Sequence, residues 1–310
     1  MQPGCSQHHW AVHPGRTPVI VQQQECQFNP DCYNPKVTQL SFQDIYTALK
    51  KLELDRGCPV IVHASLSSFG QVAGGAETVV RGLVATCNTL IMPAFTYKSM
   101  VIPEVGPLGN AIEYGSGIYT NRIAEFFRPN MPVDRLIGSI PEALRRYPGA
   151  RRSSHPVLSF TGFNAQRFLS AQTVAEPLAP IRCLHEEGGW VLLLGVNFCV
   201  NTSIHYAELL AGRKQFLRWA LTPNGVVACL GFPGCSDGFE TLQPDLKTVT
   251  RRVQVRSAQI QALPLADLIQ AACQRIAADP YALLCSRPDC ERCNAARANV
   301  GKTEVGTVKR

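Results

Sequence analysis

Short apolar runs typical of buried β-strands alternate with segments of helical periodicity through most of this chain. Residues 60–62, 89–92 and 191–195 have strand character, and residues 76–87 carry the apolar stripe of an amphipathic helix. Strands that alternate with helices favour an α/β fold with a mostly parallel central sheet. After residue 218 the pattern changes to strands and turns, which predicts a mixed sheet rather than a purely parallel one.

The chain divides into three regions of different composition. Residues 1–35 are rich in Gln, Pro, His and Cys and show no strand or helix period, so we expect an irregular Cys/His-containing arm. Residues 36–284 carry the alternating pattern and form the predicted main domain. Residues 285–310 form a predicted basic, Cys-containing tail. With 310 residues, the chain is long enough for one large core.

Charge and hydropathy exclude several classes of partner. The net charge is +7, but no basic run with interleaved aromatic residues points to nucleic acid. No apolar run approaches the ~18 residues that suggest a membrane span. The N-terminus lacks a signal pattern, so we expect a cytoplasmic protein. Its thirteen cysteines should then be mostly reduced.

Two histidines lie beside hydroxyl groups. His155 follows Ser153 and Ser154 and precedes a proline, which predicts an extended or turn conformation. His205 shares a helix face with Glu208, because residues three apart on a helix are neighbours. A histidine oriented by a carboxylate can remove a proton from a nucleophile near neutral pH. The sequence therefore predicts an enzyme that activates a nucleophile.

These segments belong to an ordered set of motifs. Val-His-Ala-Ser-Leu-Ser-Ser-Phe-Gly at 62–70 is followed by Val-Ala-Gly-Gly-Ala-Glu at 72–77 and Met-Pro-Ala-Phe-Thr-Tyr at 92–97, and a Gly-Ser-Ile-Pro-Glu run at 138–142 precedes the first histidine. In this order, the chain resembles the aminoglycoside 3-N-acetyltransferase family from about residue 40 to residue 211. The resemblance implies an α/β/α sandwich around a mostly parallel, mixed sheet. It also implies transfer of acetyl from acetyl-CoA to an amine of an aminoglycoside, an activity of antibiotic resistance.

The resemblance also implies roles for individual residues. His155 is the expected general base for direct attack on the thioester, and Thr202, His205 and Glu208 are expected to orient the base or the acceptor. The residues expected to hold CoA lie in turns and at the start of a helix, and most of them have small or hydroxyl-bearing side chains. This expected CoA cradle comprises Ser65, Leu66, Ser67, Ser68, Phe69, Gly70, Gly74, Gly75, Ala76 and Ser154.

One departure affects the expected acceptor. Where family members often have an aspartate before the second histidine, this chain has Cys199. We therefore expect aminoglycosides to be poor acceptors, and an unrelated amine metabolite stays an alternative. Two further alternatives are a zinc-dependent hydrolase that uses His63, His155 and His205, and a non-catalytic binder with the same fold. The oligomeric state stays open, with a homodimer as one alternative.

Cysteines near the C-terminus suggest a metal site. Cys285, Cys290 and Cys293 form a Cys-x4-Cys-x2-Cys run, and the Cys-x2-Cys pair has the spacing of a zinc knuckle. We expect one structural zinc, with its fourth ligand a cysteine or histidine from the first 35 residues. The alternative is a tail whose thiols have no metal role.

Overall fold

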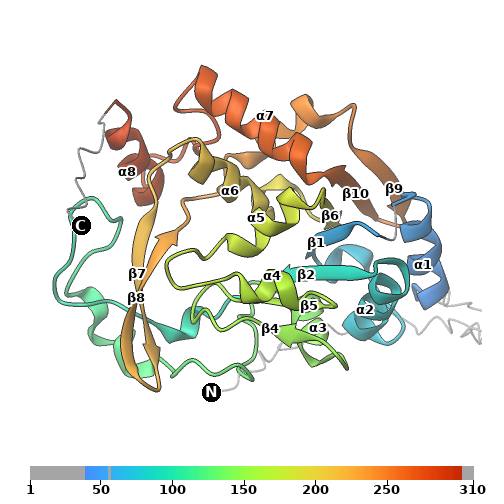
Figure 1. Ribbon diagram of the computed structural model, residues 1–310, viewed down its shortest axis with the longest axis horizontal. Helices are drawn as coiled ribbons and strands as arrows, with labels where there is room; N and C mark the ends of the chain where they lie inside the picture. The colour runs from blue at the N-terminus through green and yellow to red at the C-terminus, as the bar shows by residue number, and fades with distance from the viewer. Residues whose placement is uncertain (1–38, 55–56, 302–310) are drawn as a thin grey trace, which may run out of the picture. The chain divides into compact units, whose positions relative to one another are not determined.

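A seven-stranded mixed sheet forms the centre of the computed structural model, which describes residues 39–54 and 57–301 (Figure 1). The strand order is β4-β5-β2-β1-β6-β10-β9. β1 (Pro59–Ala64) pairs in parallel with β2 (Thr89–Pro93) and with β6 (Trp190–Leu194). The outer strands pair antiparallel, yet only β5 and β10 run against the other five. The prediction of a mostly parallel, mixed sheet is confirmed.

Both faces of the central strands are buried, because their side chains alternate between two cores. Val60 and Val62 pack on one face with Leu192, whereas Ile61 packs on the other face with Leu193. The first face is covered by α1 (Phe42–Lys50), α2 (Gly75–Thr86) and α3 (Ser139–Arg146). The second is covered by α4 (Gln166–Ser170), α5 (Ala179–Glu186), α6 (Ser203–Leu210) and α7 (Leu265–Ala278). These layers are the predicted α/β/α sandwich.

The remaining elements surround this sandwich. The other strands of the large sheet are β4 (Arg151–Arg152), β5 (Phe160–Phe163), β9 (Arg251–Val255) and β10 (Ala258–Pro264). β3 (Met100–Val101), β7 (Phe216–Thr222) and β8 (Gly225–Phe232) form a separate three-stranded antiparallel sheet. Short 3-10 helices lie at Ser67–Phe69, Tyr97–Ser99, Ser116–Ile118, Asn121–Ile123, Phe198–Val200 and Phe239–Leu246. None of the described helices combines the length and apolar character that a membrane crossing needs.

The structure describes part of the predicted C-terminal region but none of the predicted N-terminal arm. The predicted arm, residues 1–35, lies outside the described residues. Residues 285–301, which belong to the predicted Cys-containing tail, contain α8 (Glu291–Asn299). Arg292 of α8 donates a hydrogen bond to the Gly234 carbonyl at 2.8 Å, so this helix is tied to the segment that follows β8.

Candidate active site

A cleft opens at the carboxyl ends of β1 and β6, where open α/β sheets commonly bind ligands. Its volume is about 1380 Å³, which is large enough for an extended ligand. Segments far apart in the sequence line it. Most of the lining comes from residues 62–68 at the end of β1, from Pro93, Phe95 and Tyr97 at and after the end of β2, and from parts of 135–141 around the start of α3, 195–202 after β6, 232–236 at the end of β8 and 257–261 at the start of β10.

A histidine and a carboxylate form a hydrogen-bonded pair on the cleft wall. His205 lines the cleft, and its Nδ1 lies 2.7 Å from Oε2 of Glu208. Oε1 of Glu208 accepts a hydrogen bond from Arg213 at 2.9 Å, so both carboxylate oxygens are fixed. The His205 ring packs edge-on against Phe239. A neutral His205 that donates its Nδ1 proton to Glu208 keeps the lone pair of Nε2 for a ligand.

His155, the predicted base, occupies a different kind of site. It is 2% exposed and is not among the described residues that line the cleft, although its neighbour Leu158 is. Its Nδ1 accepts hydrogen bonds from the backbone N–H groups of Val157 and Leu158 at 3.1 and 3.0 Å. The neutral ring therefore carries its proton on Nε2, and burial lowers its pKa to about 4. Its Nε2 has no hydrogen-bond partner within the described part of the chain.

The serine turn after β1 faces the cleft as the predicted CoA cradle requires. Ser65, Leu66, Ser67, Ser68 and Gly70 all line it, whereas Phe69 packs beneath in the core. The hydroxyls of Ser65 and Ser67 lie 3.0 Å apart, and Ser68 donates to the Ser65 carbonyl at 2.7 Å. The other predicted cradle residues lie outside the described lining, namely Gly74, Gly75, Ala76 and Ser154.

Three buried polar atoms gather on the cleft floor. Nε2 of His63, Nδ2 of Asn201 and Oε1 of Gln261 have no hydrogen-bond partner within the described part of the chain. His63 and Gln261 flank Leu193 in register across β1, β6 and β10. Burial, and secondarily the charge of nearby His205, lowers the pKa of His63 to about 3. Buried polar groups normally pair, so these three atoms mark where a polar ligand fits.

Thr202 also lines the cleft, at the N-cap of α6. Within the described residues its hydroxyl makes no capping hydrogen bond, so that group can face a ligand. Thr202, His205 and the serine turn are therefore brought together as predicted, and Gln261 joins them. Its only sequence signal is a polar residue among apolar neighbours of a strand.

The charged side chains of the lining are few. Among the described lining residues, Glu240 is the single carboxylate, against the guanidinium groups of Arg135 and Arg292. Glu240 accepts a hydrogen bond from the Phe198 backbone N–H at 2.9 Å, next to Cys199, whose thiol lies 3.5 Å from the Asp237 carbonyl. None of these three charged residues stands in a motif of the sequence.

The histidines proposed for a zinc hydrolase form no metal-binding cluster in the described part of the chain. Among the described residues, the one cluster of three or more side chains able to hold a metal is formed by Cys235, Cys285, Cys290 and Cys293. His63, His155 and His205 are absent from it. A zinc-dependent hydrolase built on these three histidines therefore has no support in this geometry.

Comparison of the sequence with known proteins identifies one family of relatives. The sequence profile of the aminoglycoside 3-N-acetyltransferase family matches residues 61–277. A prophage-derived aminoglycoside N(3')-acetyltransferase-like protein of Bacillus subtilis, YokD, is 33% identical over 176 residues, which are 54% of this chain and 64% of YokD. Aminoglycoside N(3)-acetyltransferase III of a Salmonella species is 31% identical over 229 residues, covering 64% of this chain and 77% of that enzyme.

Solved structures give the same assignment. The apoenzyme of aminoglycoside acetyltransferase AAC(3)-IVa superposes with a TM-score of 0.69 at 25% identity, covering 84% of this chain and 98% of that one. Profile, relatives and fold all point to one group of N-acetyltransferase enzymes. The chain therefore belongs to the aminoglycoside 3-N-acetyltransferase family.

Proposed function

We propose that this protein transfers the acetyl group of acetyl-CoA to an amine, with His205 rather than His155 as the general base. The observation that carries the proposal is the 2.7 Å contact between His205 Nδ1 and Glu208 Oε2 on the cleft wall. Glu208 sets the tautomer of the ring and stabilises the imidazolium that forms. Arg213 holds the carboxylate in place through its other oxygen.

The reaction follows from these positions. The amine nitrogen attacks the thioester carbonyl carbon while Nε2 of His205 accepts the amine proton. Asn201 Nδ2, a donor unpaired within the described chain, or the Thr202 hydroxyl stabilises the tetrahedral oxyanion. The C–S bond then breaks, and the imidazolium returns the proton to the CoA thiolate. Family membership supports acetyl-CoA as donor, and the related AAC-IIIb has been solved as a binary complex with CoASH.

The cleft charges bear on the acceptor. Related enzymes have been solved with aminoglycosides, such as AAC-VIa with sisomicin. Here a single described lining carboxylate, Glu240, stands against two arginines. A polycation gains little from such a wall, so we infer an amine acceptor that carries less positive charge than an aminoglycoside. Thiol release from acetyl-CoA, measured with gentamicin, apramycin and simple monoamines, tests this inference. Efficient turnover of many aminoglycosides would contradict it.

Substitutions separate the two candidate bases. We expect His205→Ala to lower kcat ~10²–10⁴-fold, the usual effect of a lost general base, with CoA affinity retained in calorimetry. Glu208→Gln should lower kcat as well, because it leaves the ring unoriented. His155→Asn keeps a side-chain acceptor for the N–H groups of residues 157 and 158, so its kcat should stay near wild type.

A third histidine supplies the control. His185 lies on α5 outside the described lining, so His185→Ala should not change the rate. If the His155→Asn enzyme loses its activity while His205→Ala keeps it, the assignment of the base is wrong. If no amine supports thiol release but CoA still binds, the catalytic proposal as a whole fails.

A further inference from the structure

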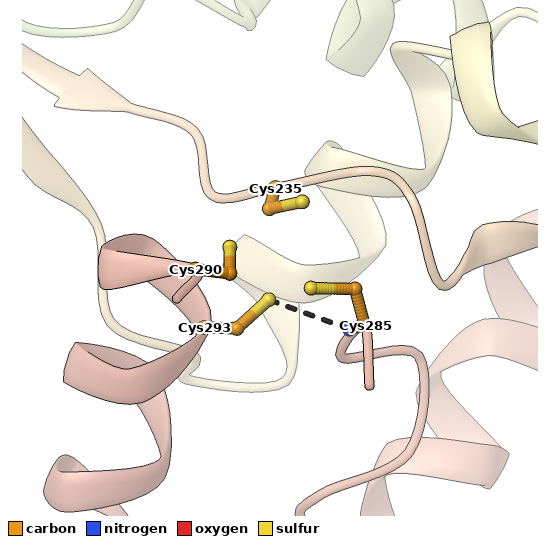
Figure 2. A group of neighbouring side chains, drawn as sticks. All are labelled: Cys235, Cys285, Cys290 and Cys293. Carbon is orange, nitrogen blue, oxygen red and sulfur yellow. Dashed lines mark hydrogen bonds between the residues drawn. The ribbon is translucent and has the colours of Figure 1, made fainter. Parts of the chain in front are cut away.

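Four cysteine side chains from two distant parts of the chain meet in one buried cluster (Figure 2). Cys235 lies between β8 and the 3-10 helix at Phe239–Leu246, and Cys285, Cys290 and Cys293 lie at and before the start of α8. Their sulfur atoms are all within 4.8 Å of one another. The four residues are 3%, 4%, 6% and 0% exposed. A buried cluster of four thiols offers a complete set of ligands.

The spacing suits a tetrahedral metal. Four ~2.3 Å Zn–S bonds in a tetrahedron place the sulfurs about 3.8 Å apart. The separations of up to 4.8 Å therefore need to contract by only about an ångström around an ion. Cys290 is the N-cap of α8 and Cys293 lies in its first turn, which gives the Cys-x2-Cys pair its bite. A disulfide joins two sulfurs, whereas the convergence here involves all four.

Hydrogen-bond donors around the sulfurs suit thiolates. The Cys285 backbone N–H donates to the Cys293 sulfur at 3.4 Å, and the Asp237 N–H donates to the Cys235 sulfur at 3.5 Å. Outer partners of this kind orient metal ligands and spread their charge. Arg287, paired with Asp237 at 3.0 Å, adds a guanidinium beside the cluster. These groups offset the net charge of about −2 that four thiolates and one Zn²⁺ carry.

We propose that Cys235, Cys285, Cys290 and Cys293 bind one structural zinc ion. The sequence predicted three of these ligands and placed the fourth within the first 35 residues, which lie outside the described residues. Cys235 fills the fourth position instead. Four protein ligands leave no open coordination site, so the ion stabilises the fold rather than activating water. Because thiolate coordination forms only in the folded chain, its free energy adds to folding.

The site would also fix one wall of the cleft. Cys235 stands between Gly234 and Ser236, which both line the cleft. Arg292 lines it too, from α8, and donates to the Gly234 carbonyl. One ion would thus join this lining segment to α8. That effect on the wall rests on the proposed acetyl transfer, whereas zinc content can be measured whether or not the enzyme acts on any amine.

Metal content tests the proposal directly. The full chain, purified in reductant without a histidine tag, should contain one zinc per chain by mass spectrometry under native conditions and by elemental analysis. Cys235→Ser and Cys293→Ser should each lose most of that zinc and melt at a lower temperature. Cys229→Ser is the matched control, because Cys229 is a buried thiol (1% exposed) outside the cluster and its loss should leave zinc content unchanged.

Cobalt gives a second readout if the serine variants fail to fold. Wild-type protein stripped of zinc by a thiol-specific mercurial, then reduced and given Co²⁺ alone, should develop the intense absorption of tetrahedral cobalt–thiolate coordination. Wild-type protein without zinc that also takes up no Co²⁺ would overturn the proposal. So would full zinc occupancy in both serine variants, or a disulfide within the cluster that persists in reductant.

Discussion

At the scale of single residues, His155 and His205 have different surroundings in the fold. Both stand beside hydroxyl groups, and only His155 belongs to a motif with a proline turn. In the turn that follows His155, the backbone N–H groups of Val157 and Leu158 both donate to its Nδ1. The pairing of His205 with Glu208 follows from helix spacing and is confirmed as a contact. Which histidine faces the cleft depends on tertiary packing that local spacing does not encode.

The two buried histidines predict how stability depends on pH. Burial lowers the pKa of His155 to about 4 and that of His63 to about 3, whereas the unfolded chain titrates near the ordinary 6.5. Between the folded-state and unfolded-state pKa values, the unfolded chain binds more protons than the folded chain. The folded state is therefore destabilised relative to the unfolded state as the pH falls. The free energy of unfolding should have its full value above about pH 7. At about pH 5 it should be lower by about 2 kcal/mol for each of the two histidines.

Urea unfolding at the two pH values measures this effect. The His155→Asn variant should lose a smaller part of its stability on acidification, because one of the two titrating groups is gone. Equal stability of the wild-type protein at both pH values would show that neither histidine is held neutral by burial.

At the scale of elements, the regular parts of the fold are those that local pattern predicted. Ser41 and Asp44 start α1 with reciprocal capping hydrogen bonds, a pattern that a serine followed by an acid three residues later favours. The apolar run 191–195 becomes β6 at the centre of the sheet. β5 begins at Phe160, and just before it the carbonyls of Val157 and Ser159 accept hydrogen bonds from the backbone N–H groups of Thr96 and Ala94 at 2.9 and 2.8 Å. Long-range hydrogen bonds of this kind leave no periodic signal.

A glycine at the end of β6 packs closely against the serine turn at residues 65–68. Gly195 has a φ of 66°, and a Cβ there would lie 1.7 Å from the Ser68 hydroxyl. We expect Gly195→Ala to displace Ser68 and to weaken CoA binding at least tenfold. It should also cost about 1–3 kcal/mol of stability from strain and overpacking. Calorimetry with CoA and thermal unfolding measure the two effects.

Gly212 provides the matched control for this substitution. Its φ is 72°, but nothing in the described structure lies within 4 Å of a Cβ placed there. Gly212→Ala should therefore show the backbone strain alone, with normal CoA affinity. Equal loss of CoA affinity in both variants would exclude the contact with Ser68 as the cause.

At the scale of the whole molecule, the site combines residues that the sequence keeps far apart. The motifs near residues 65 and 205 were predictable, and they face the same cleft. Glu240 and Arg292 reach it from the 3-10 helix at Phe239–Leu246 and from α8, without any local pattern of function. Cys235 is similar, because a lone cysteine beside a glycine has no metal-binding signature of its own. Only the folded chain brings it to the other three cysteines.

The unpaired atoms of the cleft floor also make this protein less stable than its fold allows. A buried polar group without a partner costs ~1–3 kcal/mol, and His63, Asn201 and Gln261 each contribute one such atom, counted within the described chain. Gln261→Met should therefore raise the free energy of unfolding by about 1 kcal/mol, and with it the melting temperature, while it weakens ligand binding. Gln172→Met should do the opposite to stability, because the Gln172 amide is fully bonded to Ser153, Leu158 and Pro177. Thermal unfolding of the two variants would reveal a trade-off between activity and thermostability. Variants of this enzyme selected for heat resistance would then be expected to change first at these cleft residues and to lose activity as they do.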